Sequence, residues 1–192
     1  MPTLRTFARI TLGGLALAEG AFALARWQAR RETYDLAARR AAALRRPLVV
    51  VGDPDSGAHT RLYRAYGCGD LCVDINGCPL CKVVQVADIT AGPVRGVADD
   101  SAVVFVSCVL EYVSDPAAAV HELRRMAGGP ENLFDVAVQP WTLTAALYPG
   151  ARWTAVRDAD QMTLTPISPS RKALTAGALA GLAAAALWPA SE

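Results

Sequence analysis

Residues 46–76 read RPLVVVGDPDSGAHTRLYRAYGCGDLCVDIN and decide how the rest of the chain is interpreted. The apolar run LVVV is followed by a turn that has Gly52 and Gly57 at its two ends, and a second apolar run closes on Asp74. Short runs without polar residues are typical of parallel strands that are buried on both faces. The order of strand, glycine turn and strand ending in an acid predicts a ligand site of the nucleotide-cofactor type.

Two later segments have the same strand-like character. They are AVVFVSCVL at residues 102–110 and NLFDVAVQ at residues 132–139. Strands that alternate with helices along a chain favour a doubly wound, mostly parallel sheet, and ligands bind such sheets at the carboxyl ends of the strands. We therefore expect an α/β domain over residues 47–168.

The segment SDPAAAVHELRRMAGG, between these two strands, is expected to form a helix. Ser114 or Asp115 can cap its start, and Pro116 suits the first helical turn. The paired Gly128 and Gly129 are typical of a helix end.

Composition points to a partly membrane-bound chain. Of its 192 residues, 53% are hydrophobic, which is high for a soluble domain of this size. Its 19 basic and 18 acidic residues give a net charge of +1, so no global field would attract nucleic acid.

Both ends of the chain are apolar. The segment from residue 7 to residue 26 contains one acid, Glu19, and approaches the roughly 20 residues that a helix needs to cross a bilayer. Residues 173–190 contain no charge, and Trp188 stands where an interfacial aromatic would lie. The alternatives are a cleaved signal peptide for the first segment and a soluble Ala-rich helix for the second.

These observations divide the chain into four parts. We expect a transmembrane anchor at residues 1–26, a basic amphipathic connector helix at 27–46, the α/β domain at 47–168, and a second transmembrane helix at 171–190. The connector is either a continuous helix that joins membrane to domain or one that lies on an anionic membrane surface.

The flanking charges predict an orientation. Arg26, Arg30 and Arg31 follow the first apolar segment, and Arg171 and Lys172 precede the second. The positive-inside rule therefore places the central domain in the cytoplasm and both termini outside.

Small residues in the apolar segments predict helix contacts within the membrane. Gly177 and Gly181 form a GxxxG pair, which allows two helix backbones to approach closely. Glu19 would be costly if it faced lipid, so we expect it to face a partner helix or a polar cavity. Other membrane subunits are the partners that these residues predict.

The stretch DDSAVVFVSCVLEYVSDPAAAVHELRRMAGG, residues 99–129, resembles the fourth-strand region of class I S-adenosylmethionine-dependent methyltransferases of the small-molecule type. These enzymes typically have an acidic start, an apolar strand, a Leu-Glu-His-like turn, Asp-Pro, an amphipathic helix and paired glycines. The likeness extends more loosely over residues 48–138. The resemblance implies a Rossmann-like methyltransferase fold, here shortened.

The resemblance also implies roles for individual residues. Gly52 and Gly57 would let the backbone approach S-adenosylmethionine, Asp74 would accept hydrogen bonds from the ribose hydroxyls, and Asp88 would accept one from the adenine amine. The pair that follows the strand of residues 102–110 is expected to face the substrate for acid–base or contact roles. This pair is Glu111 and Tyr112.

The chain departs from the family at the glycine turn and after the second strand. Pro54 removes a backbone donor from the turn, and Asp53 and Asp55 stand where the carboxylate of the cofactor would lie. Only GCPLCK separates VDIN from VVQVADI, whereas a parallel crossover usually needs a dozen residues or more. We therefore expect VVQVADI to form a hairpin-like neighbour or to lie outside this sheet.

Four cysteines lie close together in the sequence, at positions 68, 72, 78 and 81. Cys68, Cys72, Cys78 and Cys81 would suit a four-thiolate zinc site, a disulfide, or ordinary buried thiols. A cytoplasmic domain argues against stable disulfides. Cys108 is expected in a strand.

Beyond the last predicted strand, the segments ARWTAV and QMTLTPI are expected to pair as a closing hairpin. The aromatic residues Trp141, Tyr148 and Trp153 suggest a lid over the site, a core cluster or a contact surface.

Two functions follow from the sequence. The first is a membrane-anchored methyltransferase that transfers a methyl group from S-adenosylmethionine to a small or lipid-like acceptor. The second is an inactive protein of the same fold that serves as a structural subunit of a membrane complex, since fold alone does not fix function.

Overall fold

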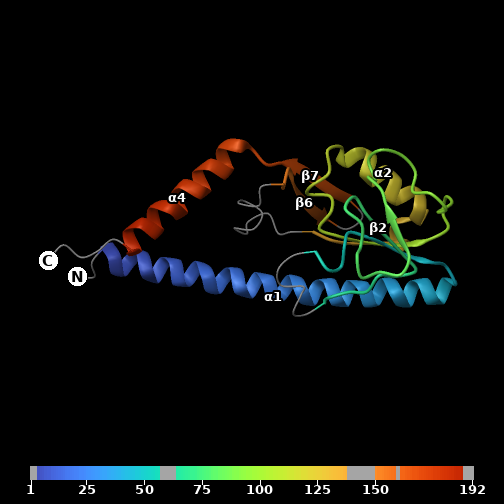
Figure 1. Cartoon of the computed structure of the whole chain (residues 1–192), viewed down its shortest axis with the longest axis horizontal. Helices are drawn as coiled ribbons and strands as arrows, with labels where there is room; N and C mark the ends of the chain where they lie inside the picture. The colour runs from blue at the N-terminus through green and yellow to red at the C-terminus, as the bar shows by residue number, and fades with distance from the viewer. Residues whose placement is uncertain (1–3, 57–63, 138–149, 159–160, 188–192) are drawn as a thin grey trace.

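The structure is a computed structural model that describes residues 4–56, 64–137, 150–158 and 161–187. A long helix, an α/β domain, a hairpin and a terminal helix follow one another along the chain (Figure 1). The elements are α1 (Leu4–Leu44), β1 (Leu48–Val51), β2 (Leu71–Asp74), β3 (Val84–Val86), β4 (Val103–Ser107), α2 (Pro116–Ala127), the 3-10 helix η1 (Pro130–Asn132), β5 (Leu133–Val136), β6 (Trp153–Asp158), β7 (Gln161–Pro166) and α4 (Pro169–Leu187).

The five strands β1 to β5 form one parallel sheet. Their order is β3-β2-β1-β4-β5, and every neighbouring pair is parallel. The strand order reverses between β1 and β4, so this junction is the switch point where ligands usually bind. The predicted α/β fold with a parallel sheet is confirmed, and the structure is consistent with a Rossmann-like fold.

Helices cover the two faces of the sheet. Val49 and Val51 of β1 face a core cluster that includes α2, while Leu48 and Val50 face a second cluster that includes α1. This alternation follows from the two-residue period of a strand, and it requires an apolar run in every central strand. Figure 1 shows α2 and α1 on opposite sides of the sheet.

The helix α2 begins and ends where the sequence predicts. Oδ1 of Asp115 accepts hydrogen bonds from the backbone amides of Ala117 and Ala118, each at 3.0 Å, which satisfies two amides of the first turn. Gly128 closes the helix with a φ of 74°, a conformation that favours glycine.

The helix α1 is continuous from the apolar N-terminal segment to the sheet. Ala37 and Ala41, near its end, are buried against the sheet, and the ring of Tyr34 meets Phe105 of β4 edge-on at 5.4 Å. Of the two arrangements considered for residues 27–46, the structure has the continuous helix. This part of α1 also supplies the cover for one sheet face.

The prediction for VVQVADI was wrong, because β3 is a parallel strand of the main sheet. It pairs with β2 from Cys72–Val84 to Asp74–Val86, and residues 75–83 connect the two strands without a helix. A short connection suffices because β3 has three residues and lies at the sheet edge, so the chain returns over a short distance. Gly77, with a φ of 80°, makes one of the turns.

The predicted hairpin of β6 and β7 is confirmed, and it forms a separate two-stranded sheet. Its start is fastened to the loop after β4: the amides of Arg152 and Trp153 donate to the carbonyl of Glu111 at 2.7 and 3.1 Å. Nε1 of Trp153 donates to the carbonyl of Val113 at 2.9 Å. The expected lid residues Trp141 and Tyr148 lie outside the described residues.

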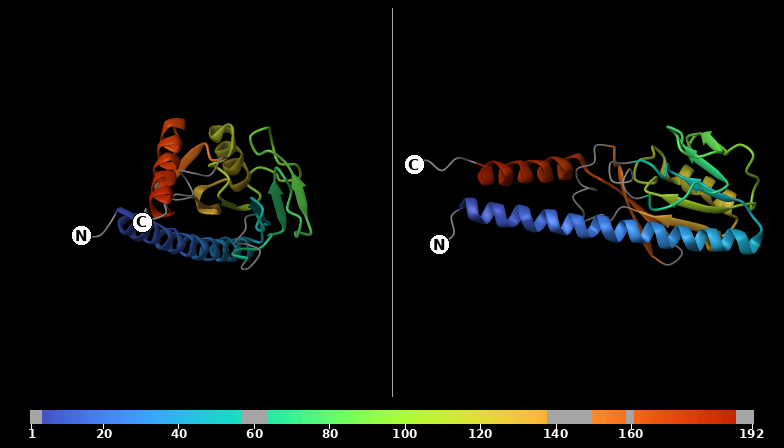
Figure 2. Two further views of the ribbon diagram at one scale, coloured as in Figure 1. Left: turned by 60° about the vertical axis from the view of Figure 1, so that its left-hand side comes forward. Right: turned by 60° about the horizontal axis from the view of Figure 1, so that its bottom comes forward.

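The two terminal helices run toward the same end of the molecule, away from the sheet (Figure 2). Arg9 Nε donates to the carbonyl of Ala186 at 3.3 Å, and Ala8 and Ala186 are both buried. Among the described residues, only α1 is long and apolar enough to cross a membrane. The second span, in α4, remains a prediction.

The expected helix–helix role of the GxxxG pair also remains a prediction. A Cβ atom added to Gly177 or Gly181 would meet no atom within 4 Å. The pair therefore makes no close helix contact with the described part of the chain.

Candidate functional site

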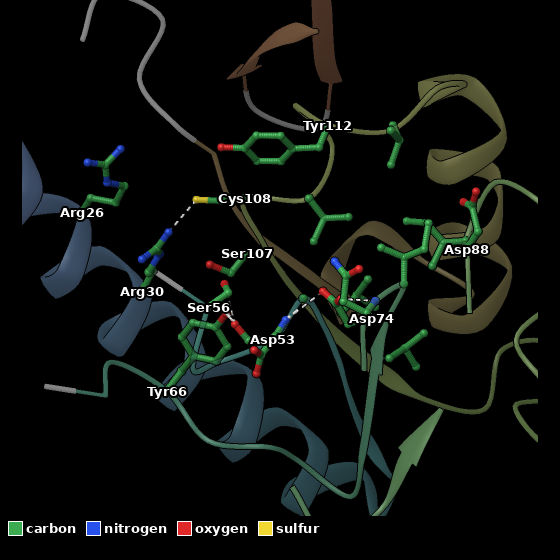
Figure 3. A pocket seen from close by; sticks show the side chains of 18 of the residues that line it. Arg26, Arg30, Asp53, Ser56, Tyr66, Asp74, Asp88, Ser107, Cys108 and Tyr112 are labelled. Atoms are coloured by element: carbon green, nitrogen blue, oxygen red, sulfur yellow. Dashed lines mark hydrogen bonds between the residues drawn. The ribbon is translucent and has the colours of Figure 1, made fainter. Parts of the chain in front are cut away.

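A cavity of about 1190 Å³ lies at the carboxyl edge of the sheet, over the switch point between β1 and β4 (Figure 3). Residues at or just after the ends of β1, β2, β3 and β4 form one wall, and α1 forms another. The lining residues used below are Glu19, Gly20, Ala23, Arg26, Arg30, Gly52, Asp53, Tyr66, Asp74, Ile75, Asp88, Ser107, Cys108, Val109, Tyr112 and Arg152.

Four of the predicted site residues meet in this cavity. Gly52, Asp74, Asp88 and Tyr112 all line it. Glu111 is absent from this lining: it is buried beside β5, and its backbone carbonyl holds the β6 end of the hairpin. Gly57 lies outside the described residues.

Gly52 is required by the packing of the turn. Its φ is 104°, and an added Cβ would lie 2.9 Å from Cγ2 of Val109 and 3.0 Å from the carbonyl oxygen of Ser107. Its amide donates to the carbonyl of Val73 at 2.9 Å, which ties the end of β1 to β2. Glycine therefore brings the turn against β4, where a side chain would collide.

Asp74 is held in place by the same turn. Its Oδ2 accepts a hydrogen bond from the amide of Asp53 at 3.1 Å, and its Oδ1 accepts one from the amide of Asn76 at 2.7 Å. An ionised carboxylate has about four acceptor positions, so two bonds leave it the capacity to accept from a ligand diol.

Asp88 is oriented by Thr90. The amide and the hydroxyl of Thr90 donate to Oδ1 of Asp88 at 2.8 and 2.7 Å. This side chain follows the edge strand β3, so the two predicted acids stand on neighbouring strands at one end of the cavity (Figure 3).

Asp53 adds a third carboxyl group to this wall, between the acids and α1 (Figure 3). Burial raises the pKa of Asp53, and the nearby carboxylates of Asp55 and Asp74 raise it further. Asp55 itself forms an ion pair with Arg64 at 3.0 Å. Of the two aspartates that were expected to crowd the turn, it is therefore Asp53 that lines the cavity.

Tyr66 closes the floor next to this turn. Its hydroxyl donates to the carbonyl of Asp53 at 3.3 Å, and burial raises the pKa of Tyr66 to about 12. The phenol therefore stays protonated at neutral pH.

The opposite wall is basic. Arg30 Nη2 donates to Sγ of Cys108 at 2.9 Å, and Arg26 lies one helical turn before Arg30 on α1. Cys108 follows β4 directly, with a φ of 52° that is unusual for a residue with a side chain. Burial raises the pKa of the Cys108 thiol, with an opposing effect from the charge of Arg30.

Sequence reasoning missed this basic wall. Arg30 and Cys108 are 78 residues apart, and the sequence assigns Arg26 and Arg30 to the flank of a membrane span and to the start of the basic connector helix. Their spacing of four residues, which places both on one helix face, was the available signal.

The four clustered cysteines form two disulfides, Cys68–Cys81 and Cys72–Cys78. The expectation that stable disulfides would be absent was therefore wrong, because the short crossover brings the sulfur atoms together. Sγ atoms of Cys72, Cys78 and Cys81 lie within 4.8 Å of one another, so the group has the spacing to hold a metal. Zinc needs thiolates, which means that the disulfides and a zinc site exclude each other.

Taken together, the cavity offers acceptors at one end and guanidinium groups at the other. Asp74 and Asp88 suit hydroxyl and amine donors, and Arg26 and Arg30 suit a carboxylate or phosphate. The chain matches no protein-family model, no curated protein and no solved structure.

Proposed function

We propose that this protein is a membrane-anchored methyltransferase-like protein that binds S-adenosylmethionine in the cavity at the switch point. The supporting observation is the opposed chemistry of the two cavity walls. Asp74 and Asp88 would accept from the ribose hydroxyls and the adenine amine, and Arg30 would face the carboxylate of the methionine part.

The cofactor would supply a methyl group on a sulfonium, and the chain's own residues would supply positioning. Asp74, fixed by two backbone amides, would orient the nucleoside. Tyr112, whose hydroxyl Figure 3 shows on the Cys108 side of the cavity, would contact the acceptor. The buried Glu111 would act indirectly, by holding the hairpin through its carbonyl.

The anchor in this proposal is the N-terminal part of α1. Leu17 and Leu24 are 78% and 58% exposed, so the helix shows large apolar side chains to its surroundings although its other half packs on the sheet. An exposed apolar helix of this length is stable in a bilayer and costly in water.

An inactive structural subunit is the second candidate. It is favoured by Asp53, whose carboxyl group occupies the cavity beside Asp74 and would repel a carboxylate there. The two candidates differ in whether the cavity binds the cofactor.

The test compares two neutralising variants of the full chain in detergent. We expect S-adenosylmethionine to raise the unfolding midpoint of the native protein and of Asp99→Asn, because Asp99 precedes β4 at the opposite sheet edge and is 80% exposed. Asp74→Asn should weaken binding roughly 10- to 100-fold, since it removes a charged acceptor. Equal midpoint shifts in both variants would contradict the assignment of Asp74.

A further inference from the structure

The cavity continues along α1, away from the sheet. Its lining residues on this helix are Glu19, Gly20, Ala23, Arg26 and Arg30. Residues 19, 23, 26 and 30 recur at the three- and four-residue spacing that defines one helix face. At 1.5 Å per residue, this face extends the cavity wall by about 16 Å along the helix.

The far end of this wall lies within the predicted membrane span. Glu19, Gly20 and Ala23 belong to the apolar segment of residues 7–26, and Arg26 stands at its border. The seven steps from Glu19 to Arg26 cover about 10 Å of helix. If the segment spans a bilayer, the cavity therefore opens at the level of the lipid interface and outer acyl region.

The surroundings of this opening are apolar. Gly20 and Ala23 line the cavity on α1 and are exposed, and Ile75 at the sheet side of the cavity is 61% exposed. Exposed apolar surface that adjoins a cavity typically marks a ligand or membrane site. An apolar chain can reach the cavity along Gly20 and Ala23, beside Glu19, an acidic side chain that lines the same wall.

The polar groups at the border are basic. Arg26 is half-buried, points toward the cavity in Figure 3, and has no ion pair with any residue that the structure describes. Arg30 and Arg152 line the same region. Arg26, a guanidinium group at the border of the apolar segment, suits an amphiphile with an anionic headgroup.

The size of the cavity leaves room for such a molecule beside a nucleoside. Pockets for single drug-sized ligands usually measure about 300–1000 Å³. At about 1190 Å³, this cavity exceeds that range. Two ligands, one at the acidic wall and one along α1, are consistent with its volume and its divided chemistry.

We propose that the acceptor of this site is a membrane-resident amphiphile, with an acidic headgroup at Arg26 and an apolar chain along the face of α1 that holds Gly20 and Ala23. The proposal rests on the proposed function for its chemistry, because the amphiphile would stand opposite the nucleoside end at Asp74. It names the class of acceptor and its route of entry, which is lateral and from the bilayer.

The test uses the full chain in phosphatidylcholine nanodiscs that contain a photoreactive fatty acid, a diazirine-bearing palmitic acid. Gly20→Trp would fill the proposed passage. Gly13→Trp is the matched control: it is the same change on the same helix, an added Cβ meets nothing within 4 Å at either position, and Gly13 does not line the cavity.

We expect the probe to label peptides that line the cavity, around residues 20–30 and 107–114, in the native protein. Gly20→Trp should reduce that labelling at least five-fold, and Gly13→Trp should leave it within two-fold of native. Equal labelling in the two variants, or labelling of exposed faces alone, would overturn the proposal.

A second arm tests the headgroup. Arg26→Gln should reduce labelling by the fatty acid, and a fatty alcohol of the same chain should label the native cavity poorly. Equal labelling by acid and alcohol would overturn the anionic assignment. Binding of S-adenosylmethionine to the same samples is measured separately: cavity labelling without cofactor binding would defeat the methyltransferase proposal and leave the amphiphile site standing.

Discussion

Glu122 shows at the scale of one residue how α2 is fixed to the segment between β3 and β4. Both of its carboxylate oxygens accept from Arg125 at 2.8 Å, and Oε1 also accepts from the amide of Val94 at 2.8 Å. Burial by itself raises the pKa of Glu122, but the hydrogen bonds from Arg125 and Val94 lower it by more, so the net pKa lies below its usual value. The ionised form is therefore the one that the fold stabilises.

The lowered pKa of Glu122 predicts how the stability of the protein depends on pH. A carboxyl whose pKa is lowered on folding contributes stability that is present above its unfolded pKa, about 4.3, and is lost as pH falls through the folded value. Glu122→Gln should lower the free energy of unfolding by about 1–3 kcal/mol at pH 7 and by less below pH 4. Thermal unfolding in detergent from pH 3 to 7 measures it. The exposed Glu131→Gln is the control, and identical pH profiles for the two variants would contradict the role of Glu122.

Gly52 gives a second prediction at this scale. Gly52→Ala should destabilise the protein by about 1–3 kcal/mol, because it adds a collision with Ser107 and Val109 to the strain of a positive φ. Gly92→Ala separates the two effects, since Gly92 has a φ of 140° and an added Cβ would meet nothing within 4 Å. Equal unfolding temperatures for the two alanine variants would show that the collision at Gly52 does not destabilise the protein.

At the scale of elements, the crossover from β2 to β3 depends on its cysteines. The two disulfides close loops with sequence separations of 13 and 6 residues. On the loop-entropy model they contribute about 3 and about 2 kcal/mol to stability by restricting the unfolded chain. Replacing Cys68 and Cys81 by serine should therefore lower the free energy of unfolding more than replacing Cys72 and Cys78.

The measurement is denaturant unfolding of both double variants without reductant. Native protein with a reductant is the control. Its free energy of unfolding should fall by most of the sum of the losses measured for the two double variants. A larger loss from the Cys72 and Cys78 pair, which closes the shorter loop, would contradict the entropic account.

The elements also show which parts of the fold the sequence could predict. β1 and β4 were predictable because central parallel strands need unbroken apolar runs, and α2 because Asp115 and Gly128 mark its ends. The three-residue β3 carries too little periodicity to distinguish its pairing. The covering role of α1 was hidden because buried Ala37 and Ala41 are interleaved with arginines.

The candidate site, too, was predictable only where a local sequence pattern marks its residues. Gly52 and Asp74 stand at the ends of apolar runs, and the resemblance to methyltransferases indicated Asp88; the structure places all three at one sheet edge. Arg30 and Cys108 depend on the packing of a distant helix against the end of β4, which no local pattern records.

At the scale of the whole molecule, two features favour opposite locations for the domain. Arg26, Arg30 and Arg31 at the domain end of the α1 span favour the cytoplasm, whereas the two disulfides are typical of oxidising compartments. The proposed use of S-adenosylmethionine requires the cytoplasm. In the cytoplasm the two disulfides that the structure contains would be reduced, and they would form on exposure to air.

Alkylation of cysteines in cells lysed directly into acid tests this expectation. If the domain is cytoplasmic, all five cysteines of the chain should be alkylated without prior reduction. Modification of Cys108 alone would place the domain in an oxidising compartment and would contradict the predicted orientation.

The central claim is that the cavity at the switch point binds a nucleoside cofactor. Its most direct test is calorimetric titration of S-adenosylmethionine into the native full chain, in detergent and with the cysteines reduced. We expect saturable binding with a micromolar dissociation constant, lost on addition of excess S-adenosylhomocysteine as competitor. Absence of heat up to millimolar ligand would contradict the account and would favour the structural-subunit alternative.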